Sequence, residues 1–173
     1  MHWLDTEHRY GAVSRALHWS MALLVLLMLG SDWWMEEFEG LGEAAAMTLH
    51  QSIGMTLLAL LAFRLAWRVV NRGRPVPPAH WRLAARLGHL VLYALLLVIP
   101  LSGLLAAIGS GEGVTLFGVP LVAAGAEIEW LEEAFEETHE VLANLLWFVI
   151  AGHVIAALAH QWWLGERSLQ RMT

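Results

Sequence analysis

Cysteine is absent from the 173 residues of this chain. Disulfide bonds, iron–sulfur clusters and thiolate ligands are therefore excluded, and any metal has to be bound by histidine or carboxylate side chains. Charged residues are also scarce, at 15% of the sequence, whereas 58% is hydrophobic and the mean hydropathy is +0.55. A soluble domain of this length has too little interior to hide so much apolar surface. Part of the chain is therefore expected to face lipid.

Four apolar segments are long enough to cross a bilayer. They cover residues 14–35, 44–70, 87–108 and 138–164. The first ends without a small-residue cleavage site, so we expect it to be retained as a helix rather than removed as a signal peptide. The third contains Pro100, whose kink a helix bundle tolerates. The sequence predicts an all-α fold, a four-helix transmembrane bundle that forms one membrane-embedded domain over residues 1–173.

The connections between these segments alternate sharply in charge. All ten basic residues lie near one set of ends, before the first segment, around the second connection or after the fourth. The first and third connections hold no base and, with Glu140, carry all but three of the 16 acids. By the positive-inside rule both termini are expected to be cytoplasmic in a multi-pass membrane protein, and the two acidic connections are expected to face the periplasm or exterior. Within the longer acidic loop, residues 127–137 (EIEWLEEAFEE) are expected to form a short amphipathic surface helix.

Histidines recur within the apolar segments at related depths. His139 and His153 are 14 residues apart, about 21 Å along a helix and close to four turns, so their rings project from nearly the same face. The topology places His50 level with His139 near the exterior, and His18 level with His153 near the cytoplasm. Each pair comes from two helices, an arrangement that holds a flat macrocycle by two axial nitrogens. We therefore predict two stacked haem groups, with these four histidines as their iron ligands.

Other interpretations of the same residues remain open. Membrane histidines also bridge helices by hydrogen bonds or line a proton path, which would make the protein non-redox. A zinc site is less suitable, because its ligands would have to converge at one depth. Small residues lie near the predicted ligands, and they either admit a porphyrin edge or allow close helix packing: Gly54, Gly103 and Gly152.

Two further histidines, His89 and His160, are expected beyond the inner haem, toward the cytoplasmic boundary. A quinone needs a hydrogen-bond donor and a proton source when it is reduced, and either histidine could supply both; His160 is the predicted catalytic residue and His89 a predicted cofactor-binding one. The alternative is interfacial anchoring within an aromatic belt. The same zone holds three further predicted cofactor-binding residues, of which the two arginines are available to the inner haem: Arg15, Arg86 and Trp162. Trp163 follows Trp162 in the sequence. Three remaining histidines are expected to be ordinary solvated residues: His2, His8 and His80.

Over essentially its whole length the sequence resembles the bacterial di-haem cytochrome b561 family, which includes superoxide oxidase. The motifs that carry the resemblance are SRALHW, LHQSIGM, GHLVLYALLLVIPLSGL and HEVLANLLWFVIAGHVIAALAHQ. The resemblance implies a multi-pass protein of the bacterial inner membrane, with two bis-histidine haems b at the four histidines named above. It also implies ubiquinone near the cytoplasmic end, where His160 matches a residue associated with the quinone, and it implies superoxide as the exterior electron donor.

The electrostatics of the exterior face favour a different donor. Superoxide is an anion, whereas the exterior connections carry many carboxylates and no base, so the overall field repels it. A cationic periplasmic electron donor fits an acidic rim better, and adaptation to high salt would produce the same rim. The alternative function is thus a cytochrome b subunit that links a periplasmic redox partner or dehydrogenase to the quinone pool. Membrane lipids are expected partners, nucleic acid is not, and formation of a homo-oligomer remains open.

Overall fold

The computed structural model describes all residues except 1, 38–41, 72–74 and 76–79. Its helices are α1 (Ala12–Leu29), α2 (Ser31–Glu37), α3 (Glu43–Val70), α4 (Arg82–Gly109), α5 (Glu129–Trp162) and the 3-10 helix η2 (Leu169–Arg171). Four of these, α1, α3, α4 and α5, are long and apolar enough to cross a membrane. The predicted transmembrane helical fold is therefore confirmed. Three charged residues of the predicted connections, Glu39, Arg72 and Arg74, lie outside the described residues.

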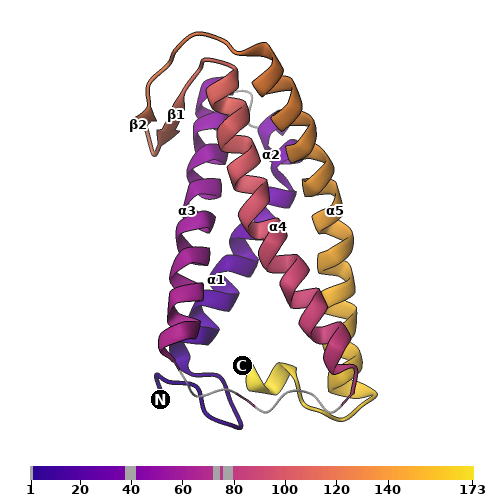
Figure 1. Cartoon of the computed structure of the whole chain (residues 1–173). Coiled ribbons are helices and arrows are strands. Elements are labelled where there is room, and N and C mark those ends of the chain that lie inside the picture. The colour runs from indigo at the N-terminus through magenta and orange to yellow at the C-terminus, as the bar shows by residue number, and fades with distance from the viewer. Residues whose placement is uncertain (1, 38–41, 72–74, 76–79) are drawn as a thin grey trace.

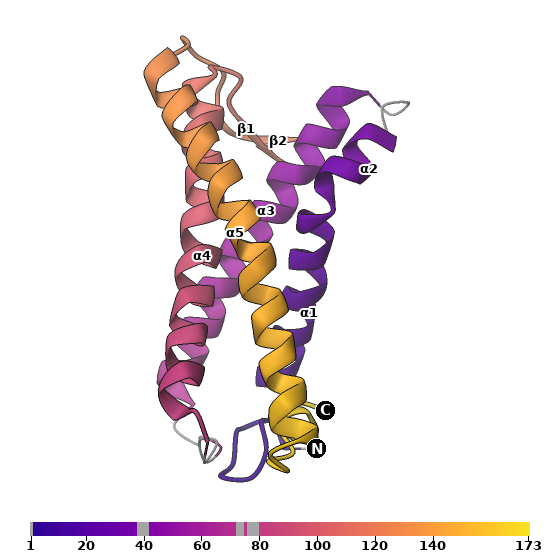
Figure 2. The ribbon, with the colours of Figure 1, turned by 90° about the vertical axis from the view of Figure 1, so that its right-hand side faces the viewer.

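The four long helices run along one common direction, and both chain termini lie at the same end (Figure 1). The opposite end carries α2 and a small β-hairpin. We call these the termini end and the hairpin end. A view turned by 90° shows the same division, with α4 beside α5 and α1 below α2 (Figure 2). Helix α4 packs most extensively against α5, and α3 packs against both α1 and α4.

The helix boundaries differ from the predicted segments in informative ways. The first segment divides at Gly30, which ends α1 and precedes α2. The predicted separate surface helix at residues 127–137 is wrong, because α5 begins at Glu129 and continues without interruption to Trp162. No glycine or proline interrupts that junction, and the acids of the first turn favour a helix N-terminus. Helix α4 runs through Pro100 and begins earlier than predicted, at Arg82.

The hairpin was not predicted from the sequence. It pairs β1 (Val114–Leu116) with β2 (Val119–Val122) in antiparallel fashion. Its turn residues, Phe117 and Gly118, have positive φ angles of 49° and 83°, as a tight two-residue hairpin turn requires. The N–H of Phe117 donates to the hydroxyl oxygen of Ser52 at 2.7 Å, so the hairpin is attached to α3.

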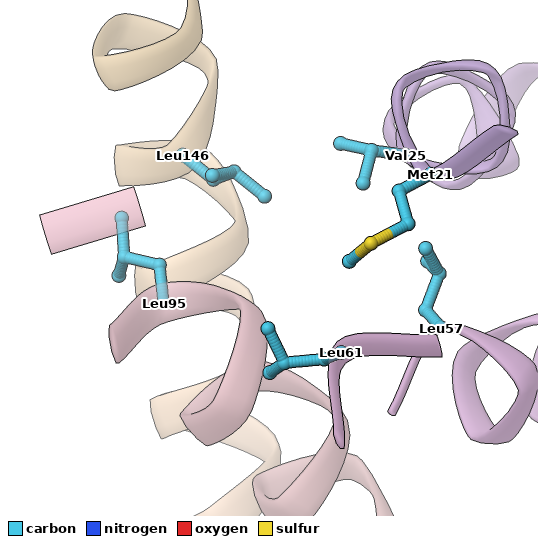
Figure 3. Packing of buried hydrophobic residues seen from close by; sticks show 6 residues of the cluster. All are labelled: Met21, Val25, Leu57, Leu61, Leu95 and Leu146. Atoms are coloured by element: carbon cyan, nitrogen blue, oxygen red, sulfur yellow. The ribbon is translucent and has the colours of Figure 1, made fainter. Parts of the chain in front are cut away.

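A compact apolar cluster lies at the middle of the bundle. Its six buried side chains come from all four long helices and point toward one another (Figure 3): Met21, Val25, Leu57, Leu61, Leu95 and Leu146. Leu146 is seven residues from both His139 and His153, and Leu57 is seven residues from His50. Residues a heptad apart share a helix face. The core therefore lies between the two levels of histidines.

Candidate functional site

At the hairpin end, α3 and α5 bring His50 and His139 together. Their ring centroids are 6.0 Å apart, with the ring planes at 59°. Two imidazoles that bind one metal from opposite sides, each through a nitrogen about 2 Å away, hold their ring centres roughly 6 Å apart. The separation of this outer pair therefore fits a single iron atom between the rings.

His139 is oriented by helix α4. Its Nδ1 lies 2.9 Å from the carbonyl oxygen of Ile99, and because a carbonyl only accepts, Nδ1 must carry the proton. Nε2 is then the nitrogen available to a metal, and such a carbonyl contact is the usual support for a ligand histidine. Gly103, one turn beyond Ile99, makes the approach possible, since a Cβ there would lie 2.9 Å from the ring. Gly103 thus makes room for the predicted ligand itself.

The other two glycines offer no comparable contact. A Cβ on Gly152 would meet nothing within 4 Å, and one on Gly54 would meet only the terminal methyl of Met28 at 3.9 Å. Both positions therefore leave open space on their helices. Their role in admitting a porphyrin edge stays a prediction.

Toward the termini end, α1 and α5 bring His18 and His153 together at 6.5 Å between ring centroids and an angle of 69°. The separation of this inner pair again fits one iron. The ring of His89 lies 5.4 Å from that of His153, so α4 adds a third imidazole at this level. His89 is therefore beside the inner pair and not beyond it as expected, because α4 begins at Arg82 and places His89 two turns into the helix. Its Nδ1 donates to the carbonyl of Ala85 at 2.6 Å.

Arg64 of α3 lies beside the inner pair, and no role was predicted for it from the sequence. Its Nη1 is 3.3 Å from Nδ1 of His18, and its guanidinium carbon lies 5.7 Å from the ring centre of Tyr93. A signal existed, because Arg64 follows His50 by the 14 residues that also separate His139 from His153. An arginine within an apolar helix is itself costly and usually functional. Its planar cation suits a carboxylate at this level, such as a haem propionate.

The two arginines predicted to bind propionates are placed differently from each other. Arg15 contacts the main-chain oxygen of Thr173 through Nη1, and its buried Nε has no partner among the described residues. The Nε–H of Arg15 therefore remains an unused hydrogen-bond donor within the described part of the chain. Arg15 also lines a shallow depression of about 320 Å³ beside α1, and His160 is not among the residues that line it. Arg86 is exposed. Trp162 is exposed as well, at 71%, as befits an aromatic side chain at a membrane boundary.

His160 is buried, with 7% of the residue exposed, and it belongs to a small polar network at the termini end. Its Nδ1 lies 2.7 Å from Oε2 of Glu166, whose other oxygen, Oε1, lies 2.7 Å from Nδ1 of His80. The ring of Trp81 packs edge-on against His160 at 5.6 Å. Burial alone would raise the pKa of Glu166, but hydrogen bonds from His80 and His160 outweigh it and hold the pKa at about 2. The carboxylate is therefore ionised between the two imidazoles.

No role was predicted for Glu166, and His80 was predicted to be an ordinary solvated residue. His80 is in fact 58% exposed, yet its backbone N–H also donates to Glu166 at 2.9 Å. Glu166 is the single acid in an otherwise basic C-terminal tail, which was a weak signal. Its contact with His80 spans 86 positions of the sequence, and no local pattern indicates such a pairing.

Comparisons with known proteins point to a single family. The family model described as prokaryotic cytochrome b561 matches residues 9–173. The chain is 34% identical to cytochrome b561 homolog 2 of Escherichia coli K12, over 99% of this chain and 95% of that protein. It is 29% identical to cytochrome b561 homolog 1 of the same organism, over 95% and 97% of the two chains. It is 27% identical to the probable superoxide oxidase CybB of Yersinia pestis, over 95% of each chain.

Proposed function

The chain belongs to the prokaryotic cytochrome b561 family, and from this premise we propose that it is a di-haem cytochrome b that carries electrons across a membrane to ubiquinone. The observation that carries the proposal is the pair of imidazole couples, at ring separations of 6.0 and 6.5 Å, one on each side of the apolar core. Each separation suits two axial ligands of one iron.

In this proposal His50 and His139 hold the outer haem, and His18 and His153 hold the inner one. When bound, each haem supplies an iron atom that takes up and releases one electron at a time. Arg64 supplies a cation at the inner level, within reach of His18. The charge distribution supports an orientation in which the termini end is cytoplasmic and the hairpin end faces the periplasm of a bacterial inner membrane.

We propose superoxide as the electron donor at the hairpin end. The likeness to a probable superoxide oxidase, at 27% identity along nearly the whole chain, supports this choice. Each superoxide gives up one electron and becomes O₂. Two such events provide the two electrons that, with two protons, convert one ubiquinone to the quinol. His160, buried at the termini end, is the proposed proton donor to the quinone.

A second candidate is an electron-transfer subunit without a small-molecule donor. The first and third connections of the chain carry carboxylates and no base, a surface that attracts a cationic redox protein and repels an anion. Under this alternative a basic soluble protein docks at the hairpin end and delivers its electrons there.

Two measurements on the purified protein test these proposals. Its haem content comes first: two haems per chain support the proposal, and a colourless protein refutes both redox functions. Next, the oxidised protein is mixed with superoxide, with and without ubiquinone, while haem reduction is followed by absorbance. Rapid reduction that reverses when quinone is added supports superoxide oxidation. Reduction no faster than that of free haem excludes it and favours the second candidate, whose rate with a cationic donor should fall as salt rises.

A further inference from the structure

Helix α5 ends near a hydrogen-bonded chain of three titratable side chains that leads from solvent to a buried ring. His80 is 58% exposed, whereas the side chains of Glu166 and His160 are only 10% and 8% exposed. The two contacts of 2.7 Å use different carboxylate oxygens, Oε1 toward His80 and Oε2 toward His160. One carboxylate thus joins the surface imidazole to the buried one.

The backbone holds this carboxylate firmly in place. The N–H of Glu166 donates to the carbonyl of His160 at 2.8 Å, which turns the chain directly after α5. From the other side, the N–H of His80 donates to Oε1 at 2.9 Å. Trp81 packs edge-on against the ring of His160. The orientation of His160 is therefore determined by the segment before α4 and by the segment after α5.

This geometry determines which nitrogen of His160 can act on another molecule. Since the ionised Glu166 only accepts, Nδ1 of His160 must be the donor to it. Nε2 lies on the opposite side of the ring and is the nitrogen left for a substrate. When Nε2 also carries a proton the ring is a cation, and the carboxylate at 2.7 Å balances that charge in a site that is largely closed to water.

We propose that Glu166 is the positioning residue for proton delivery to the quinone. It orients His160 with Nε2 toward the bound quinone and carries the counter-charge of the doubly protonated ring. His80 holds the carboxylate from the solvent side. The inference rests on the proposed reduction of ubiquinone. In the delivery step the Nε2–H bond breaks and an O–H bond forms on a quinone carbonyl oxygen that has received its electrons. His160 is left neutral with its remaining proton on Nδ1; the second proton of the quinol comes from water, and the ring regains its own proton from water after the quinol leaves.

The test is the substitution Glu166→Gln, which keeps the shape of the side chain but removes its charge. Protein with reduced haems is mixed with a water-soluble ubiquinone, and haem reoxidation is followed at several quinone concentrations. We expect kcat to fall roughly 10- to 100-fold with KM unchanged, less than the roughly 10²- to 10⁴-fold that a general acid contributes, because His160 itself stays in place. The solvent deuterium isotope effect should rise, because proton transfer becomes slower than the other steps. Glu166→Asp should recover part of the rate.

A matched control is available on the same segment. The amide oxygen of Gln161 accepts a hydrogen bond from the N–H of Leu169 at 3.1 Å, so Gln161→Ala loosens the same tail without touching the network. Its kcat and isotope effect should equal those of the wild type. Equal slowing of Gln161→Ala and Glu166→Gln would assign the effect to loss of structure and overturn the inference.

Two outcomes separate this inference from the proposed function. If quinone fails to reoxidise the haems of the wild-type protein, the proposed function itself is wrong. If quinone reoxidises them and Glu166→Gln behaves as the wild type, only the role of Glu166 is wrong. Should Glu166→Gln fail to assemble with haem, the exposed His80→Asn serves instead. It should lower kcat severalfold at unchanged KM, and an unchanged kcat would overturn the inference.

Discussion

Alanine in place of Gly103 should weaken haem binding at the outer pair. The added Cβ would lie 2.9 Å from both Cε1 and Nδ1 of His139, whereas non-bonded carbon atoms are normally about 3.5 Å apart or more. The ring would have to move by roughly 0.6 Å to reach that separation. Nδ1 of the ring, however, is hydrogen-bonded to the carbonyl of Ile99 at 2.9 Å. The substitution therefore forces the ring away from the contact that orients it.

The expected size of the effect follows from that hydrogen bond. Loss of the outer partner of a ligand histidine typically lowers metal affinity about 10- to 100-fold, which corresponds to roughly 1.4 to 2.8 kcal/mol of binding free energy. The inner pair is on the other side of the apolar core and should be unaffected. Gly103→Ala should therefore bind one haem with wild-type affinity and the other weakly.

Titration of haem into the purified chain, followed by absorbance and by haem-to-protein ratio, measures this loss. Gly88→Ala is the matched control: it adds the same methyl group to the same helix, α4, yet that methyl would meet nothing within 4 Å. The control should bind two haems normally. If Gly103→Ala also binds two haems with unchanged affinity and spectrum, His139 is not held as an iron ligand in the way described above.

Three further predictions concern other parts of the molecule. Replacing Arg64 by glutamine removes a cation beside His18 and should lower the midpoint potential of the inner haem by roughly tens of millivolts, while Arg64→Lys should keep it; a redox titration that shows no shift excludes this influence. The carboxyl group of Glu166 has a pKa of about 2 instead of 4.5, so its contribution to stability is complete above pH 4.5 and is lost as the pH falls toward 2. The difference in the free energy of unfolding between wild type and Glu166→Gln should therefore shrink between pH 5 and pH 3. The change should be no more than about 1 kcal/mol, because the His80 side is exposed to water. A difference that stays constant over this range would contradict the low pKa. Ser52→Ala leaves the N–H of Phe117 without its acceptor and should cost about 1 to 3 kcal/mol, seen as faster hydrogen exchange of the hairpin amides, whereas unchanged exchange would show that the hairpin is held by other contacts.

The membrane-spanning helices could be predicted from the sequence because their signal is local. Each apolar run is long enough to be recognised by itself, and the 14-residue step between His139 and His153 places two rings on one face by helix geometry alone. The same reasoning applied to α3 would have reached Arg64. The structure brings the predicted histidine pairs together, while their binding of iron stays a proposal.

The features that were missed depend on contacts between distant segments. The hairpin turn at Phe117 and Gly118 lacks the Asn-Gly pattern of a strong turn signal, and the hairpin is attached through Ser52, 65 positions away. The predicted boundary between residues 127–137 and 138–164 was wrong. The charge of the sequence changes abruptly there, whereas its helical periodicity continues. The network around Glu166 depends on contacts with His80 and Trp81, just before α4, and these residues are distant in the sequence from α5.

The 14-residue step also explains which helix supplies each ligand at the two histidine levels. A step of 11 residues would place the levels about 16 Å apart, and a step of 18 about 27 Å, nearly the full hydrocarbon thickness. Fourteen residues give about 21 Å, which leaves room for the apolar core, at a rotation of only about 40° that helix tilt can absorb. On α5 this step runs from His139 through Leu146 to His153, so α5 serves both levels. On α3 it runs from His50 to Arg64, so α3 offers a ring at one level and a cation at the other, and the second ring of the inner pair has to come from another helix, which is α1 with His18.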